Sequence, residues 1–528
     1  MLRLLIPTEK SEVLQPSIVL GDGRRWEVVD ASSLPNVPAY ICISFAWGDS
    51  PIPNPMYGGS NLMSARTINV LQTTIRAVVD EEYPAIWIDS FCIPPIGDSS
   101  RTDALDRMGD IYSEASKVVV VLSESSYAFL KLAKDGISGQ ANMTHTPALE
   151  ALEKDTWVTR AWTYQEIANS NDWSFVTEGH PEDTMVNGMD LLNALGNTRM
   201  AYCRPYRNED GTIRTPDTET TVRFRFPNVD LFEDALAERM VAKPLERSAL
   251  QTMSSVTRRI RERGEDYFNA MIGAIAGGGE SGNSIRMDWK NMVESPLVQE
   301  LENQLVFSQA GGNRTETEGI VDFILKPMKV AFAANRFMQT CERNGDYSFI
   351  YTTTDRSEIK GQSWRPVADV LKPICLWHNW GTGQPGDIKD GGLELQEMLS
   401  VQLGNLSGEA TQFIRTWVQF SYPDEAFPVS VDNVEKCLKE VGFSTTDENV
   451  GAIMLKDGYF FHQKRVDGNN VGKVFVSSTI RWVFGAPAIM MAPANQDLHA
   501  GTFISVGIFV GDVYEMEKRL DKVTVRLQ

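Results

Sequence analysis

Histidine and paired cysteine are scarce in this sequence, and their scarcity excludes several kinds of site. Only five histidines occur among 528 residues, too few and too scattered to complete a metal set. The six cysteines stand singly, without a Cys-x-x-Cys pair, so neither a disulfide framework nor a zinc site is indicated. The lone pair Cys375 and His378 is therefore interpreted as structural, and we assign no metal ligands. Reduced thiols are expected, as in intracellular proteins.

Basic residues are in deficit. Lysine and arginine number 50 against 70 aspartates and glutamates, which gives a formal net charge of -20. Such a charge disfavours binding to nucleic-acid backbones and to anionic membrane surfaces. No apolar run approaches the roughly 18 residues that a membrane-spanning helix needs, and the apolar start is too short for a secretory signal. We predict a cytoplasmic protein that binds neither nucleic acid nor membrane.

Common catalytic motifs are also missing. No Gly-x-Ser-x-Gly elbow occurs, so a Ser-His-Asp triad is not supported. The glycine-rich segments 277–282 and 468–473 lack the Lys-Ser/Thr ending of a phosphate loop. Cys92 follows an apolar run, where a nucleophile can sit, but no histidine occurs in the first 144 residues. A buried, unreactive thiol is the favoured interpretation of Cys92.

Three short apolar runs organise the first 170 residues. They are Tyr40–Trp47, Ile86–Cys92 and Lys117–Leu122, and segments of helical periodicity separate them. This alternation predicts βαβ units, and hence an α/β fold with a mostly parallel sheet flanked by helices on both faces. Ligands of such sheets bind at the carboxyl ends of the strands. The predicted strand ends carry Ser44, Trp47, Asp89 and Ser123.

A helix predicted over Trp157–Ala168 carries a second candidate group. Trp162 and Glu166 are four residues apart and should share one helix face. A carboxylate beside an indole is a candidate functional pair. The alternative is that Glu166 forms a salt bridge with Arg160 or another surface partner. For Asp89, capping by backbone amides and contact with ligand hydroxyls are equally good interpretations.

The remainder of the chain is interpreted as two further regions. Residues 176–345 are mainly helical, and the basic run Arg258–Arg263 is interpreted as the solvated face of a helix. Residues 346–528 are predicted to be α+β, with a strand at Ser348–Thr353 and helices at Leu393–Leu403 and Val434–Val441. We divide the chain at residues 1–175, 176–345 and 346–528.

The residues of the first region resemble the fungal heterokaryon incompatibility (HET) domain family. The similarity runs from Tyr40 to Glu166 and preserves the order and spacing of four blocks: Ser44–Gly48, Trp87–Ile93, Arg101 with Met108–Tyr112, and Trp157–Glu166. The family continues its second strand as Ile-Asn-Gln and opens the next helix with Glu-Arg and a nearby Gln. Here Pro94, Pro95, Ser100 and Ala104 stand at those positions, which indicates a divergent subfamily.

The resemblance has implications for fold and chemistry. HET domains are similar to the TIR fold, a flavodoxin-like sheet, and some TIR domains hydrolyse NAD with a glutamate on a helix after a tryptophan. By this similarity Glu166 is the implied catalytic residue. The implied substrate-binding residues are Ser44, Trp47, Asp89, Arg101 and Trp162. NAD is then a substrate, and no cofactor is implied.

Three hypotheses of function remain open. The first is fungal self/non-self recognition and cell-death signalling, with cleavage of NAD at the nicotinamide–ribose bond as its output. The second is a non-enzymatic module that acts through self-association and protein partners. The third is a HET-like enzyme recruited to small-molecule (secondary) metabolism. A homo-oligomer, protein partners and a nucleotide ligand are the partners that these hypotheses imply.

Overall fold

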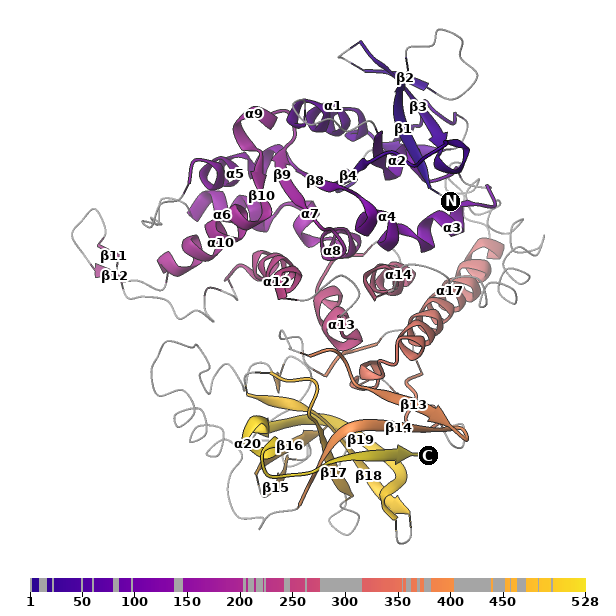
Figure 1. The fold of residues 1–528 in the computed structure, drawn as a ribbon, viewed down its shortest axis with the longest axis vertical. Helices are drawn as coiled ribbons and strands as arrows, with labels where there is room; N and C mark the ends of the chain where they lie inside the picture. The colour runs from indigo at the N-terminus through magenta and orange to yellow at the C-terminus, as the bar shows by residue number, and fades with distance from the viewer. Residues whose placement is uncertain are drawn as a thin grey trace.

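The computed structural model describes most of the chain. The described residues are 2–8, 17–20, 23–48, 51–58, 61–78, 85–95, 98–136, 146–202, 206–207, 213–214, 222, 225–241, 247–261, 264–275, 316–353, 355–357, 362–367, 371–374, 381–402, 438–439, 452–455, 457–462, 472–482, 484–494 and 497–528. Two β-sheets, with helices between them, make up this part of the protein (Figure 1).

The first sheet has a parallel centre and antiparallel edges. Its strands are β1 (Arg3–Thr8), β2 (Ser17–Val19), β3 (Arg25–Asp30), β4 (Tyr40–Phe45), β7 (Ala85–Ile88), β8 (Lys117–Leu122), β9 (Trp173–Thr177) and β10 (Val186–Asn187). Their order is β10-β9-β8-β4-β7-β1-β3-β2, and β9, β8, β4 and β7 run parallel to their neighbours in this group. A small hairpin, β5 (Pro51–Pro53) with β6 (Leu62–Ser64), lies outside this sheet. The predicted parallel pairing of the three apolar runs is confirmed, but the sheet is mixed rather than mostly parallel, since three neighbouring pairs of the described strands are parallel and four are antiparallel.

Helices cover both faces of the sheet. Helices α1 (Thr67–Ala77) and α9 (Pro181–Thr184) lie on one side, and α4 (Met108–Glu114), α7 (Thr156–Thr159) and α8 (Trp162–Ala168) lie on the other (Figure 1). The other helices of this region are α2 (Asp89–Cys92), α3 (Arg101–Asp106), α5 (Tyr127–Lys134) and α6 (Thr146–Glu153). The helix expected over Trp157–Ala168 is two helices, because Arg160 has an extended backbone and bridges to Ile260.

The described part of the middle of the chain is mainly helical. It contains α10 (Gly188–Tyr202), α12 (Pro227–Val241), α13 (Ala249–Thr257), α14 (Gly264–Ile275) and α17 (Glu316–Arg343), besides a two-residue-strand pair, β11 (Tyr206–Arg207) with β12 (Ile213–Arg214). Helices α12 and α14 pack on α8, and α14 also packs on α4. None of the described helices has both the length and the apolar character needed to span a membrane.

The basic run after α13 is not a simple solvated face. Arg259 is buried, and its guanidinium donates hydrogen bonds to the carbonyl oxygens of Val158 at 3.0 Å and Leu231 at 3.2 Å. The neighbouring Ile260 exchanges backbone hydrogen bonds with Thr159 and Ala161. The prediction of solvated arginines is therefore wrong at Arg259, whose donors hold the segment that precedes α8.

The carboxyl-terminal region is a second, mainly antiparallel sheet. Its elements are β13 (Gly386–Lys389), β14 (Gly392–Val401), β15 (Ala452–Leu455), β16 (Gly458–His462), β17 (Lys473–Ser477), β18 (Gly485–Ala494), β19 (Asp497–Gly511), helix α20 (Val513–Glu517) and β20 (Lys522–Leu527). Strand β20 pairs with both β14 and β19. A separate apolar core lies against this sheet and includes Phe460, Met490 and Phe509.

Two predictions in this region are wrong. The helix expected at Leu393–Leu403 is strand β14, in which the register shifts between Leu395 and Met398 and Glu397 has a positive φ of 58°. This β-bulge interrupts the strand alternation and leaves apolar residues three and four positions apart, which is also a helical spacing. The strand expected at Ser348–Thr353 begins as a 3-10 helix over Ser348–Ile350. Most of the predicted helix Val434–Val441 lies outside the described residues.

Asp346 joins the second sheet region to the middle helices. Its carboxylate accepts hydrogen bonds from the backbone N–H groups of Ala249 at 2.6 Å, Ser348 at 2.9 Å and Gln384 at 2.9 Å. Ala249 opens α13, so the negative charge also lies at the positive end of a helix dipole. These bonds fix the start of α13 against the segment that leads into β13.

Candidate functional site

A cavity of about 410 Å³ lies at the carboxyl ends of β4 and β7. Its lining residues come from these strand ends, from α3, α4 and α8, and from the middle helices α14 and α17. Five of the six predicted site residues line it: Trp47, Asp89, Arg101, Trp162 and Glu166. The structure thus brings together residues that are up to 119 positions apart, from Trp47 to Glu166.

Helix α8 presents Trp162 and Glu166 to the cavity. The two residues are one turn apart on α8, and both line the cavity, as their spacing predicts. Glu166 is 7% exposed, so its carboxyl group is nearly removed from solvent. Arg160, the salt-bridge partner considered from the sequence, lines the same cavity.

Ser44 occupies a place behind Glu166. Its hydroxyl donates a hydrogen bond to Glu166 Oε2 and accepts one from Trp157 Nε1 at 2.7 Å. All three side chains are buried. Ser44 was predicted to bind substrate, but it is not among the residues that line the cavity.

Asp89 lies directly beyond β7 and is held by two neighbours. Trp47 Nε1 donates a hydrogen bond to Asp89 Oδ2 at 2.6 Å, and the Ser90 hydroxyl donates to Oδ1 at 3.0 Å. The loss of hydration raises the pKa of Asp89, although these hydrogen bonds lower it. The Ser90 N–H donates to this carboxylate, so the capping interpretation is confirmed, and contact with ligand hydroxyls stays a prediction for the carboxylate that lines the cavity.

The electrostatics of Glu166 are unusual for a carboxyl group. Burial raises the pKa of Glu166 to about 8, the Ser44 hydrogen bond lowers it, Asp89 raises it, and Arg160 lowers it. Near neutral pH the carboxyl group therefore keeps its proton in much of the population. A cationic ligand in the cavity would favour the ionised form and would in turn be attracted by it.

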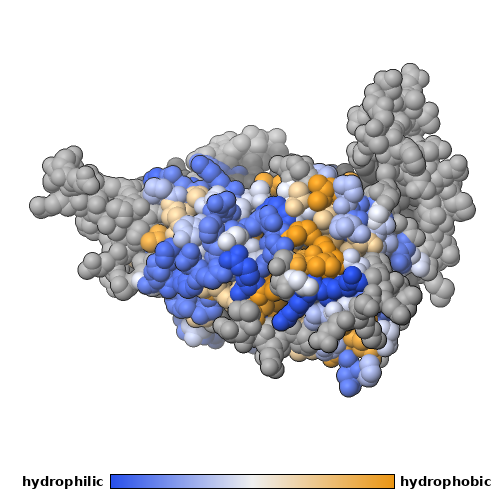
Figure 2. Space-filling view, turned by 90° about the horizontal axis from the view of Figure 1, so that it is seen from above, coloured by the Kyte–Doolittle hydropathy of each residue, from blue (hydrophilic) through white to orange (hydrophobic). Residues whose placement is uncertain are grey.

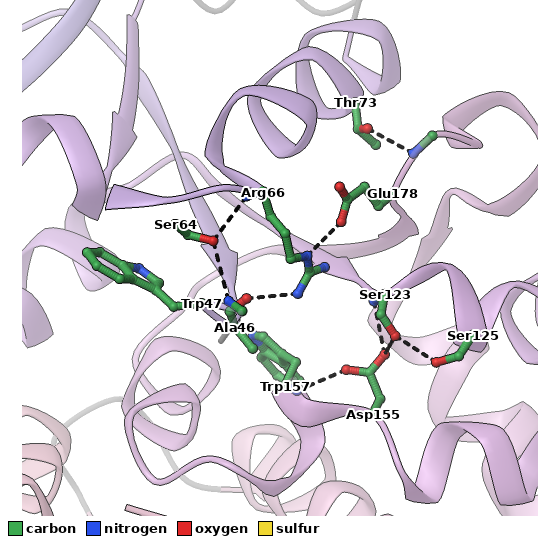
Figure 3. A network of polar contacts seen from close by, with 12 residues as sticks. Ala46, Trp47, Ser64, Arg66, Thr73, Ser123, Ser125, Asp155, Trp157 and Glu178 are labelled. Carbon is green, nitrogen blue, oxygen red and sulfur yellow. Dashed lines mark hydrogen bonds and ion pairs between the residues drawn. The ribbon is translucent and has the colours of Figure 1, made fainter. Parts of the chain in front are cut away.

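Two arginines fix the backbone that carries Trp47. Arg66, at the start of α1, donates from Nη1 to the Ala46 carbonyl at 2.8 Å and from Nε to Glu178 at 2.7 Å (Figure 3). Arg160 donates to the Trp47 carbonyl at 2.9 Å from the cavity side. Hydrogen bonds to the carbonyl groups of Ala46 and of Trp47 itself thus hold the backbone from which the Trp47 side chain projects.

None of the four family departures, Pro94, Pro95, Ser100 and Ala104, lines the cavity, although their neighbours Ile93 and Arg101 do. Arg101 donates to the carbonyl oxygen of Pro94 at 2.6 Å and lines the cavity. Ile93, Leu105 and Met108 form the wall beside it. This wall is apolar, so the polar groups that this cavity offers there are limited to Arg101.

The opposite wall comes from helices that the sequence did not connect with the site. Helix α14 contributes Glu265, Asp266 and Asn269, and α17 contributes Arg336. No local spacing relates these residues to Glu166, because the contact depends on how the helices pack. The available signal was the glycine at 273 in the apolar second half of α14, since a helical glycine often marks a close helix contact.

Helices α4, α8 and α14 meet without room for a side chain at two glycines. A Cβ atom at Gly109 would lie 2.1 Å from the carbonyl oxygen of Gly273. The same carbonyl accepts a hydrogen bond from Asn169 Nδ2 at 2.6 Å, so it has little freedom to move. This explains on physical grounds why the Met108–Tyr112 block contains a glycine.

We expect Gly109→Ala to destabilise the protein by about 1–3 kcal/mol, because the added methyl forces α4 and α14 apart. Gly196→Ala in α10 is the matched control, since a Cβ there has nothing within 4 Å and alanine favours helix by about 0.5–1 kcal/mol. Urea unfolding of the two variants checks the difference. Equal stability of both variants would show that α4 and α14 are not in tight contact.

Other candidate groups are structural. Burial raises the pKa of the Cys92 thiol to about 12, so a reactive thiolate is disfavoured, as predicted. Ser123, at the end of β8, donates to Asp155 at 2.7 Å (Figure 3), and Asp155 caps α7. No group of three or more potential metal ligands occurs among the described residues. Cys375 and His378 lie outside them.

A second cavity of about 640 Å³ lies beside α1 and contains none of the predicted site residues. Several of its polar groups pair with one another: Arg66 with Glu178, and Thr73 with the Gly179 N–H at 3.0 Å. The face of the molecule that carries α1 and α9 is largely hydrophilic, with a smaller hydrophobic area (Figure 2). The predicted site residues that line a cavity are therefore found at β4 and β7 and not beside α1.

These observations define an α/β module with tryptophans and buried carboxylates at the carboxyl ends of parallel strands. Residues 40–166 match the family model described as Heterokaryon incompatibility protein (HET), so this segment is a HET domain, and the predicted resemblance is confirmed. The chain is similar to Heterokaryon incompatibility protein 6, OR allele, of Neurospora crassa, with 31% identity over 97 residues. That similarity covers 16% of this chain and 14% of the relative. No solved structure matches the chain.

Proposed function

We propose that this chain is a fungal self/non-self recognition protein whose HET domain cleaves NAD at the nicotinamide–ribose bond, with cell-death signalling as the outcome. The HET domain and the similarity to a heterokaryon incompatibility protein support the biological role. The strand order supports a TIR-like fold. Numbered along the chain, the parallel strands β4, β7, β8 and β9 lie in the order 2-1-3-4, as in flavodoxin-like sheets.

The observation that carries the chemical proposal is the buried Glu166 beside a second carboxylate in a cavity lined by tryptophans. Ionisation of Glu166 is disfavoured in the absence of a ligand, and Asp89 adds to this. A cationic pyridinium removes this disadvantage, because its charge stabilises both carboxylates. Trp47 and Trp162 offer flat apolar surfaces for its ring.

The proposed chemistry needs no general acid. The C–N bond between the ribose and the nicotinamide breaks, and its electron pair leaves with the neutral nicotinamide. The Glu166 carboxylate holds the ribose hydroxyls and stabilises the oxocarbenium-like transition state, as carboxylates do in glycoside cleavage. Water then adds to the anomeric carbon and releases a proton. Arg101, Arg160 and Arg336, which line the same cavity, supply positive charge for the phosphates.

Nicotinamide release from NAD by the purified full-length chain, followed by chromatography, tests this proposal. Glu166→Gln is expected to lower the rate by on the order of 10²–10³-fold, the effect of removing a transition-state stabiliser. Glu182→Gln is the matched control, because Glu182 is exposed, and an ion pair with the exposed Arg76 contributes little in contact with solvent. No release by the concentrated protein, or equal rates for both variants, would refute NAD cleavage by Glu166.

Two alternative functions give different outcomes in the same experiments. If the domain acts by self-association alone, Glu166→Gln protein still signals in cells. If it is an enzyme of small-molecule metabolism, the cavity binds other ligands and NAD is not consumed. Thermal-shift measurements with NAD, adenosine monophosphate and nicotinamide distinguish these cases, since a ligand that binds only the native state raises the apparent stability.

A further inference from the structure

Ser44 and Trp157 form a hydrogen-bonded chain that ends on Glu166. We propose that Ser44 is a positioning residue, directed by Trp157, which fixes the Glu166 carboxylate for the reaction. The role in the reaction rests on the proposed function of Glu166. The two hydrogen bonds are features of the structure and do not depend on that function. Trp157 Nε1 lies 2.7 Å from Ser44 Oγ, and Ser44 Oγ contacts Glu166 Oε2.

The direction of each hydrogen bond follows from the groups involved. An indole N–H can only donate, so Ser44 Oγ must be the acceptor from Trp157. The hydroxyl has one hydrogen, and this hydrogen is left for Glu166 Oε2. Oε2 is therefore an acceptor, and a hydrogen bond donated to a carboxylate favours its ionised form. One carboxyl oxygen is held from behind while Glu166 lines the cavity with the rest of its side chain.

Packing holds Trp157, the first donor of this hydrogen-bonded series, in place. The Trp157 ring is 1% exposed and makes edge-on contacts with Phe175 at 6.0 Å and Phe232 at 5.6 Å between ring centroids. Asp155 caps the helix that carries Trp157 through the Trp157 N–H at 2.9 Å (Figure 3). Because neither the ring nor its backbone is free to move, the orientation of the Ser44 hydroxyl is also set.

Other charged and titratable groups face Glu166 from the elements around it. They are Cys42 on β4, Asp89 on α2, Arg101 on α3, Tyr112 on α4, Arg160 before α8, Glu265 and Asp266 on α14, and Arg336 on α17. Burial raises the pKa of Glu166 most. Ser44 is the strongest of the influences that lower it, ahead of Arg160. Loss of the Ser44 hydroxyl should therefore shift the ionisation of Glu166 towards higher pH.

The test compares Ser44→Ala with Ser44→Thr, which restores a hydroxyl, and with Trp157→Phe, which removes the N–H donor together with part of the ring. The rising limb of kcat/KM for NAD against pH is expected to move up by about one pH unit in Ser44→Ala, since a hydrogen bond to a charged group has about this effect. We expect Ser44→Thr to return towards the original profile. Trp157→Phe should show a smaller shift in the same direction.

A second readout does not depend on turnover. Carbon-13 NMR of labelled glutamate, with Glu166→Gln used to assign the signal, reports the protonation midpoint of Glu166 directly. A shifted midpoint without NAD cleavage would uphold the positioning role and reject the proposed function. An unchanged midpoint in folded Ser44→Ala would overturn the positioning role. If Ser44→Ala does not fold, Trp157→Phe decides the question by the same criterion.

Discussion

Glu166→Gln is expected to stabilise the protein, and to do so far more at alkaline than at acidic pH. Burial raises the pKa of Glu166 from 4.5 to about 8 in the folded state. The folded protein therefore holds this proton more tightly than the unfolded chain, so the free energy of unfolding falls as the pH rises from about 4.5 to about 8. Glutamine resembles the protonated acid and is free of this loss. The advantage of the variant should be small near about pH 5 and approach about 4 kcal/mol near about pH 9.

Thermal unfolding of both proteins over this pH range checks the expectation. The other titrating groups are common to the two proteins, so their difference isolates Glu166 to a first approximation. Glu182→Gln is again the control, because an exposed carboxyl group should give a difference that is constant between about pH 6 and about pH 9. A constant difference for Glu166→Gln as well would mean that Glu166 ionises like an ordinary surface acid.

The second large effect is expected at the ion pair beneath α8. Arg247 Nε lies 2.8 Å from Glu238 Oε1, and the two side chains are 1% and 4% exposed. Tyr164 of α8 donates to the same carboxylate at 3.0 Å, and Arg247 donates to the carbonyl of Ala168 at the end of α8. Arg247→Met leaves Glu238 buried without its counter-charge, which should cost about 3–5 kcal/mol.

Urea unfolding measures this loss, and two further variants show its origin. Arg247→Met combined with Glu238→Leu should be less destabilising than Arg247→Met alone, because no buried charge is left unpaired. Arg225→Met breaks an exposed pair with Glu150, whose side chains are 44% and 45% exposed, and should change stability by less than about 1 kcal/mol. Similar losses for Arg225→Met and Arg247→Met would contradict the role of burial.

Local spacing allowed much of the first sheet and part of the site to be predicted. The strand Lys117–Leu122 has the predicted bounds, because a run of valines between polar residues has few other interpretations. Trp162 and Glu166 share a face because four residues make about one helical turn. Trp47 and Asp89 lie together because parallel strands bring their carboxyl ends to one edge of the sheet, whereas the presence of Trp162 and Glu166 there was implied by the family resemblance.

What could not be predicted depends on packing between distant segments. Asn269 and Arg336 reach the cavity only because α14 and α17 pack against the first region. Ser44 was assigned to the ligand from its place at a strand end, but the direction of a side chain depends on its neighbours, and Trp157 lies 113 positions away. The bulge at Glu397 is likewise the reason why strand β14 was predicted to be a helix. One extra residue breaks the alternation of polar and apolar residues on which strand prediction relies.

The glycine contact between α4 and α14 makes the HET segment depend on a helix that lies outside it. Gly109 lies in the HET segment and Gly273 lies outside it, yet a methyl group on Gly109 would meet the Gly273 carbonyl oxygen, and one on Gly273 would meet the Gln165 side chain of α8. Residues 40–166 therefore match a family model without forming a separate folding unit, since one continuous apolar core extends from them into the middle helices. Exchange of this segment between relatives would succeed only where the recipient supplies a compatible α14.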